Sequence, residues 1–161
     1  MKLTFDIPDK YADSIRQVMD EVIEGLKEAE WPQNGDVICY LDSGGNIIRT
    51  VFDREYRHHN ELLNFGNYFK NREEAEFKRE QLKVLHELEE LADDDQEWNG
   101  NNHHFTIDYL HRENKLSISY WITDQYCQFY FKSEESALAA INEIGADRLK
   151  KYYFCIPEDK T

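Results

Sequence analysis

The sequence predicts an α+β fold in which an antiparallel sheet carries helices on one face. Three observations predict it. Apolar residues recur every three or four positions in long charged segments, which is the period of an amphipathic helix. β-branched and aromatic residues gather in short runs on either side of glycine or polar turns, as in β-hairpins. The order hairpin, short strand, helix occurs twice, so two similar units are expected to build the sheet.

The first thirty residues are expected to form a short strand and an amphipathic helix. Residues 2–7 alternate apolar and polar side chains and end at Pro8, which suits a strand. The apolar positions of residues 11–26 fall on one face of a helix of about twenty residues. A Trp-Pro-Gln-Asn-Gly segment at 31–35 is expected to end this helix, so residues 1–30 form a separate N-terminal part.

Residues 31–97 are expected to form the first half of the α+β domain. Two β-rich runs surround a Ser-Gly-Gly-Asn turn at 43–46, which predicts a hairpin. Residues 54–65 are charged and have no clear period, so no regular element is predicted there. A short strand at 66–70 precedes Asn71. This asparagine is the expected N-cap of a long helix, because a glutamate follows three residues later as in a capping box.

Residues 98–161 are expected to repeat this order as the second half. Alternating apolar residues predict strands over 105–109 and 116–122, joined by a polar turn. A short aromatic strand at 129–132 leads into a further helix. The segment RLKKYYFCIP at 148–157 is predicted as a last strand.

Two matching segments favour an internal duplication. NYFKNREEAEF at 67–77 and FYFKSEESALA at 129–139 share an aromatic-Phe-Lys run, a capping residue and an acidic first helical turn, 62 residues apart. The capping residues are Asn71 and Ser133. Convergence is the alternative, because acidic residues suit the positive end of any helix dipole. The hairpin before each segment favours duplication.

The chain is strongly acidic, with a net charge of −14 and an isoelectric point near 4.8. Such a surface repels phosphate backbones and anionic membranes, so direct nucleic-acid or membrane binding is not expected. It favours basic partners, which include the nucleic-acid-binding grooves of other proteins. The acids are concentrated: residues 73–97 hold eleven acidic and three basic residues, and residues 6–30 hold eight and three.

The acidic face of the helix that begins after Asn71 is the candidate binding surface. Its apolar stripe faces the core, so its carboxylates crowd the opposite face about 5–6 Å apart, close to the spacing of phosphates along a nucleic-acid strand. The alternative is a solvated face that only aids solubility. The predicted acidic contacts are Glu73, Glu76, Glu80, Glu87, Glu90, Asp93, Asp94 and Asp95.

Aromatic residues in 120–131 and 152–154 are expected to fill the core and its rim. A base-stacking platform is the alternative, but stacking surfaces usually lie in a positive electrostatic field. Trp121 and Tyr153 alternate away from their apolar neighbours, so they are candidate partner contacts.

No catalytic residue and no cofactor is predicted. A metal site would have to combine one histidine from each of the pairs at 58–59 and 103–104 with Cys39 or Cys127. The three cysteines are widely spaced, which suits a reducing compartment better than a disulfide framework. No segment is apolar and long enough for a signal peptide or a membrane span, so a cytoplasmic protein is expected.

Three segments resemble a family of small proteins encoded by phages and prophages of Firmicutes. They are GNYFKNREEAEFKREQLKVLHELEELA at 66–92, Trp-Asn-Gly at 98–100 and IGADRLKKYYF at 144–154. In that family the helix start usually has Thr or Ser where this chain has Asn71, a change that keeps the capping role. The resemblance spans about residues 31–154 and brings no catalytic motif with it.

The resemblance implies an accessory protein that acts in the cytoplasm of a bacterial host. Because such gene sets include inhibitors of bacterial defence, it implies most concretely a Cas9 inhibitor that blocks DNA binding with its acidic surface. The alternatives are a non-catalytic phage assembly module that self-associates through a sheet edge or the aromatic rim, and a metal-dependent hydrolase.

Overall fold

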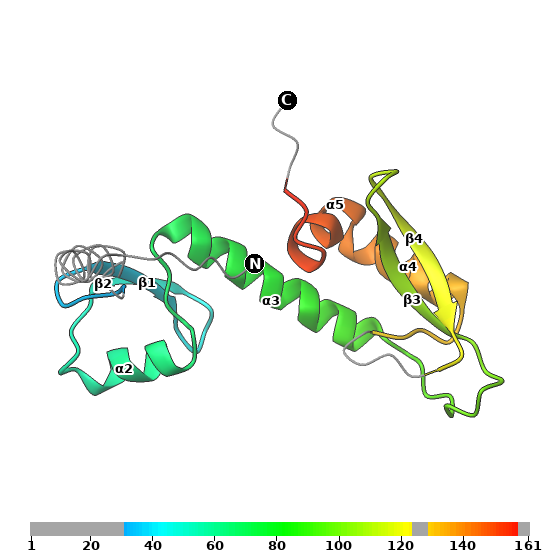
Figure 1. Cartoon of the computed structure of the whole chain (residues 1–161), viewed down its shortest axis with the longest axis horizontal. Helices are drawn as coiled ribbons and strands as arrows, with labels where there is room; N and C mark the ends of the chain where they lie inside the picture. The colour runs from blue at the N-terminus through cyan, green and yellow to red at the C-terminus, as the bar shows by residue number, and fades with distance from the viewer. Residues whose placement is uncertain (1–30, 124–128, 158–161) are drawn as a thin grey trace, which may run out of the picture. The chain divides into compact units, whose positions relative to one another are not determined.

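The computed structural model describes residues 31–123 and 129–157 and confirms the α+β class (Figure 1). The predicted strand and helix of the N-terminal part lie outside the described residues. The elements are β1 (Val37–Leu41), β2 (Ile47–Val51), α2 (Arg57–Asn64), α3 (Arg72–Leu91), β3 (His104–Leu110), β4 (Lys115–Trp121), α4 (Glu134–Ile144), α5 (Ala146–Arg148) and the π-helix η2 (Leu149–Tyr153).

The chain divides into two compact units. Of the described residues, the first unit contains 31–40 and 48–70, and the second contains 41–47 and those from 71 onward. The main boundary along the chain therefore follows residue 70, whereas the two halves predicted from the sequence meet after residue 97.

β1 and β2 form the predicted first hairpin, and Asp42 organises its turn. The Asp42 Oδ1 atom accepts hydrogen bonds from the backbone N–H groups of Gly44 at 2.9 Å and Asn46 at 2.8 Å. Gly45 has a φ of +76°, a left-handed conformation that side chains with a Cβ rarely adopt. The side-chain hydrogen bond from Asn46 lowers the pKa of Asp42, which keeps the accepting carboxylate charged.

The expectation of no regular element over 54–65 is wrong, because this segment contains α2. Leu62 and His59 lie three residues apart on one face and are both buried. The backbone N–H of Asp53 donates a hydrogen bond to His59 Nδ1 at 2.9 Å, which holds the helix start to the preceding chain. The helical period was hidden because a histidine occupies an inward position where an apolar residue is expected.

Each hairpin is extended by one antiparallel bridge to the aromatic segment that precedes the next helix. Cys39 and Phe69 exchange two backbone hydrogen bonds of 2.9 and 2.8 Å, and Phe105 and Phe131 do the same at 2.9 and 2.8 Å. The short strands predicted at these aromatic segments are therefore single bridges. An internal duplication would produce this repeated arrangement, and it stays a prediction.

The two hairpins belong to separate two-stranded sheets, β1–β2 and β3–β4. The single sheet expected from the sequence is therefore not formed by the described strands. β1 and β3 each use one residue of an edge for a bridge to their own aromatic segment, at Phe69 and Phe131.

α3 is the long green helix of Figure 1, and its start follows the sequence prediction. Asn71 Oδ1 accepts a hydrogen bond from the Glu74 backbone N–H at 2.8 Å, and Asn71 Nδ2 donates to Glu74 Oε1 at 3.1 Å. Ala75, Val84 and Leu88 are buried along the helix. Capping and an apolar stripe together explain its position.

The second hairpin, β3–β4, forms where the sequence predicts it. Burial along β3 does not alternate, because His104 and Thr106 on one face are buried as well as Ile107 on the other. The core-facing side of the hairpin supplies apolar residues to a cluster that also contains α3, α4 and η2 residues. The pairs on this face are Phe105 with Tyr120, Ile107 with Ile118, and Tyr109 with Leu116.

No helix of the described chain is long and apolar enough to cross a membrane.

α4 begins as predicted at a Ser133 cap, whose side chain accepts a hydrogen bond from the Ser136 backbone N–H at 3.1 Å. The predicted strand at 148–157 is wrong, because α5 and η2 occupy this segment. Leu149 is fully buried, and Tyr152 to Phe154 pack on the same core cluster. Apolar residues three to five positions apart reach that core from a helix, whereas a strand would turn every second one away.

Candidate functional site

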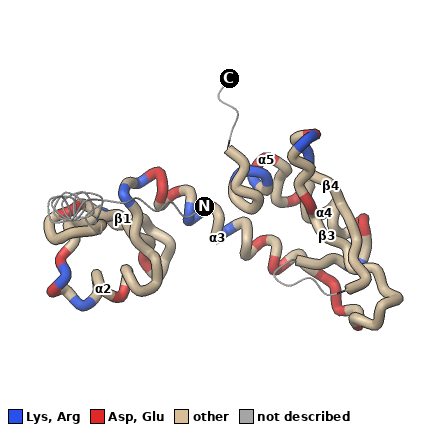
Figure 2. The backbone as a smooth tube through the Cα atoms, viewed as in Figure 1, with Lys and Arg blue, Asp and Glu red and all other residues tan. Residues whose placement is uncertain are grey.

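Two glutamates in the first half of the predicted acidic face of α3, Glu76 and Glu80, are paired with basic residues. Arg72 Nε lies 2.7 Å from Glu76 Oε1. Glu80 Oε1 lies 2.8 Å from Lys83 Nζ and 3.6 Å from Arg79 Nε. The hydrogen bond from Lys83 lowers the pKa of Glu80. Figure 2 shows that basic positions interrupt the acidic ones along this helix.

Glu87 is paired with a residue from a distant part of the second unit. Arg148 Nη1 donates to Glu87 Oε2 at 2.7 Å, and Arg148 Nη2 donates to Glu87 Oε1 at 2.9 Å. These hydrogen bonds lower the pKa of Glu87 and raise the pKa of Arg148. The pair fastens α3 to α5, so Glu87 has a structural role. Since both side chains are more than one third exposed, the contribution is about 1 kcal/mol or less.

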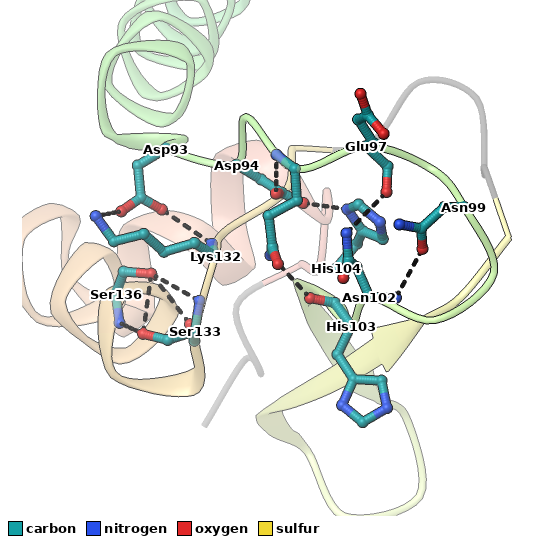
Figure 3. Close-up of polar contacts among 11 residues, drawn as sticks. Asp93, Asp94, Glu97, Asn99, Asn102, His103, His104, Lys132, Ser133 and Ser136 are labelled. Atoms are coloured by element: carbon teal, nitrogen blue, oxygen red, sulfur yellow. Dashed lines mark hydrogen bonds and ion pairs between the residues drawn. The ribbon is translucent and has the colours of Figure 1, made fainter.

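Asp93 ties the end of α3 to the segment before α4 (Figure 3). Its carboxylate accepts from the Lys132 side chain at 2.9 Å and from the Lys132 backbone N–H at 3.1 Å. Burial raises the pKa of Asp93, but the hydrogen bonds from Lys132 outweigh it and the net shift is downward.

Asp94 is withdrawn into the fold, where it contacts His104. The side chains of Asp94 and His104 are 2% and 1% exposed, and His104 Nδ1 lies 2.5 Å from Asp94 Oδ2. The Trp98 ring stacks on the imidazole with centroids 3.5 Å apart. Asp94 therefore cannot be a surface contact, which corrects its predicted role.

The loop over 92–103 folds around this pair. Gln96 Nε2 donates to the His103 carbonyl at 3.3 Å, and Asn102 Nδ2 donates to the Glu97 carbonyl at 3.0 Å. His104 Nε2 is buried and has no hydrogen-bond partner among the described residues. The pair of Asp94 and His104 has the geometry of a structural clamp for the loop.

Four exposed carboxylates remain at the C-terminal end of α3 and in the loop after it. We call Glu89, Glu90, Asp95 and Glu97 the acidic end of α3; all four are exposed. Among the ion pairs of the described chain, none involves any of them. Glu73, at the opposite end of the helix, is also exposed and outside these pairs.

The acidic end lies at the negative pole of the helix. The last turn of α3 has no basic residue, and its backbone carbonyls concentrate partial negative charge at the same place. Carboxylates at a helix C-terminus normally cost about 0.3–1 kcal/mol each. The two exposed glutamates of that turn, Glu89 and Glu90, are thus placed where they weaken the helix.

Eight acidic contacts were predicted, and only three remain available on the surface. Five have internal partners, because the same helix and its packing neighbours supply bases or a histidine to them. The engaged residues are Glu76, Glu80, Glu87, Asp93 and Asp94. The available ones are Glu73, Glu90 and Asp95. Glu89 and Glu97 are also exposed; they are not among the eight predicted contacts, although both belong to the acidic run over 73–97.

The two predicted aromatic contacts have different environments. Trp121 ends β4 with 38% of its surface exposed, so it remains accessible. Tyr153 is half-buried, and its ring lies 6.0 Å from that of Phe129 and 4.7 Å from that of Phe154. Burial, with a further effect of the nearby Asp108 charge, raises the pKa of Tyr153. Tyr153 thus belongs to the core rim.

The histidine and cysteine positions form no metal cluster within 31–123 and 129–157. His59 and His104 are each engaged in the hydrogen bonds described above. Cys39 is buried in the first hairpin, Cys155 is exposed, and Cys127 lies outside the described residues.

No family model, curated protein or solved structure matches the chain. The resemblance to phage-encoded proteins therefore stays a prediction, and the geometry of the acidic end is the basis for a functional proposal.

Proposed function

We propose that this protein is a non-catalytic binding protein whose acidic end docks on a basic, nucleic-acid-binding surface of a partner protein. The observation that carries the proposal is the placement of Glu89, Glu90, Asp95 and Glu97 at the negative pole of α3, where none of them forms an ion pair with another described residue. Residues that oppose local stability without a compensating contact are typical of functional sites.

The electrostatics of α3 support a basic partner over a neutral one. Residues 72–97 hold eleven acids and four bases, so their net charge of −7 is half of the −14 of the whole chain. Internal partners engage the centre of the acidic face, whereas the four carboxylates of the acidic end form no ion pair with another described residue. An arginine or lysine of a partner would meet both the carboxylates and the helix dipole.

The most specific form of the proposal is a phage-encoded inhibitor that occupies the DNA-binding surface of Cas9 in the cytoplasm of the host. This form rests on the resemblance of the 66–92 and 144–154 segments. The wider proposal requires only that the partner have a basic groove. A pull-down from a Cas9-carrying host lysate at low and high salt identifies the partner, which should be released as salt screens the attraction.

A charge-reversal variant tests the site. Replacing Glu89, Glu90 and Asp95 with Lys should weaken binding to purified Cas9, or to the partner recovered from lysate, by about tenfold or more. The matched control replaces three exposed acids outside α3 and its loop: Glu55→Lys, Glu135→Lys and Asp147→Lys.

Both triple variants change the net charge by the same amount, so only the position of the charges differs. If the acidic end is the binding site, the control should lose less than about threefold in affinity. Equal losses in the two variants would mean that overall charge, and not this surface, governs binding. An unchanged affinity in the α3 variant would show that the acidic end of α3 is not the binding site.

A further inference from the structure

The outer edge of β4 has unsatisfied hydrogen-bonding capacity. Phe105 exchanges both of its backbone hydrogen bonds with Phe131, so it directs neither group toward β4. In an antiparallel pair, residues bonded to one neighbour alternate with those bonded to the other. The register then directs the backbone groups of Leu116, Ile118 and Tyr120 away from β3. No backbone hydrogen bond of the described chain ends on them outside the hairpin.

An apolar groove of about 460 Å³ runs beside this edge. Leu116 and Ile118 of β4 form one wall, and Leu138 and Ile141 of α4 form the other. Leu138 is 50% exposed although it is apolar, and Tyr120 beyond the groove is 56% exposed. A strand that paired with β4 would place its own apolar side chains over these residues.

The two ends of the groove have opposite charge. Lys115 and Lys150 line one end, where Lys150 Nζ donates to the Asn114 carbonyl at 3.0 Å. Glu134 lines the groove at the first residue of α4. Glu134 follows the Phe131 bridge to Phe105, and Phe105 pairs with Tyr120. The Glu134 end of the groove therefore lies toward the C-terminus of β4.

We propose that the β4 edge binds the β4 edge of a second copy of this chain, which forms a symmetric dimer with a continuous four-stranded antiparallel sheet. A two-fold axis at Ile118 pairs Leu116 with Tyr120 of the second copy, and Ile118 with its own counterpart. The residues that meet are those whose backbone groups point outward. The same axis brings Lys115 toward Glu134 of the second copy, so each end of the groove meets its opposite charge.

Sedimentation equilibrium tests the dimer directly. The mass should rise from 19.3 kDa at about 5 µM protein toward twice that value at about 500 µM. Because each copy carries a net charge of −14, added salt should strengthen the dimer. Partner binding through the acidic end should weaken with salt, so the two proposals succeed or fail separately. A mass of 19.3 kDa at every protein and salt concentration would overturn the dimer.

Amide hydrogen exchange tests whether β4 is the edge that pairs. In dilute protein the amides of Ser117 and Ser119 should be protected by β3, and the amide of Ile118 should exchange rapidly. Protection of Ile118 should rise at least about tenfold as the dimer forms. Protection already present at monomeric concentration would show that the protein's own chain covers the edge. A dimer without new protection at Ile118 would place the interface elsewhere.

Two sets of variants test the groove and its charges. Leu138→Arg should weaken dimerisation about tenfold or more, whereas Leu82→Arg on α3, at a residue that is 48% exposed, should leave it within about twofold. Lys115→Glu and Glu134→Lys should each weaken the dimer, and the double variant should recover it. Equal effects at Leu138 and Leu82, or no recovery in the double variant, would contradict the proposed interface.

Discussion

The buried contact between Asp94 and His104 gives the loop over 92–103 its fixed shape. A carboxylate that is 2% exposed needs a hydrogen-bond donor, because water no longer reaches it. His104 supplies that donor at the first residue of β3, and Trp98 covers the imidazole from the loop. The three side chains therefore join the end of α3, the loop and the second hairpin in one unit.

Removing either partner of this pair should destabilise the fold. Asp94→Ala should lower the free energy of unfolding by roughly 1–3 kcal/mol, since a buried polar group loses its partner. The double variant Asp94→Leu with His104→Phe removes both polar groups and should recover most of the loss. Urea unfolding of the three proteins measures this. Equal losses in the single and double variants would mean that the contact does not stabilise the protein.

Acid should destabilise the protein through its paired carboxylates. Hydrogen bonds from Lys83, Arg148 and Lys132 lower the net pKa values of Glu80, Glu87 and Asp93 below their ordinary values of 4.5, 4.5 and 3.8. A group with a lowered folded-state pKa adds stability that is complete above its ordinary pKa and is lost as the pH falls through the folded value. The free energy of unfolding should therefore decrease between about pH 5 and pH 3.

The Arg148→Met variant isolates one of these pairs. It keeps most of the apolar stem but removes both hydrogen bonds to Glu87. Its free energy of unfolding should fall less than that of the natural protein over the same pH range, because Glu87 then titrates near its ordinary pKa. An identical pH dependence in the two proteins would show that the pair does not shift the titration of Glu87.

At the scale of elements, α3 combines a well-capped start with an unfavourable end. Asn71 and two glutamates of the first turn suit the positive pole, whereas Glu89 and Glu90 oppose the negative pole. The two ends therefore predict opposite effects of the same substitution. Glu89→Lys or Glu90→Lys should raise the free energy of unfolding by about 0.3–1 kcal/mol, and Glu73→Lys should lower it by a similar amount.

Thermal unfolding at low salt measures all three variants. If the acidic end is kept for binding, the stabilised Glu89 and Glu90 variants should also bind the partner more weakly, as expected where stability and function oppose each other. Stabilisation without loss of binding would indicate that these glutamates have no role in the interface.

Local signals in the sequence predicted the elements that depend on local physics. Both hairpins, the Asn71 and Ser133 caps and the faces of β3 and β4 follow from turn residues, capping and alternation. The sequence does not predict α2, because His59 takes an inward position. It predicts a strand in place of η2, because the aromatic run of η2 suits either conformation. Tertiary packing decides such cases.

The candidate site was only partly predictable for a similar reason. Carboxylates could be counted from the sequence, but the residues that neutralise them could not. Lys83 is close in sequence to Glu80, whereas Arg148 and Lys132 reach Glu87 and Asp93 from distant segments. The burial of Asp94 depends in the same way on His104. The sequence therefore predicts an acidic helix correctly and overstates how many of its carboxylates are unpaired at the surface.

For the whole molecule, the charge pattern distinguishes the two proposed associations. The described residues of 98–157 hold six acids and six bases, so the part that contains the β4 edge has no net charge. Residues 72–97 hold the excess of −7. Association through β4 is expected to depend mainly on apolar contact and backbone pairing, and association through the acidic end on long-range attraction.

The slope of partner affinity against salt concentration tests the central claim most directly. The natural protein should lose affinity steeply as salt rises from about 50 to about 300 mM, and the variant with Glu89, Glu90 and Asp95 changed to Lys should show a much flatter slope. The same steep slope in both proteins would show that the salt-sensitive attraction arises elsewhere, and it would contradict a binding role for the acidic end of α3.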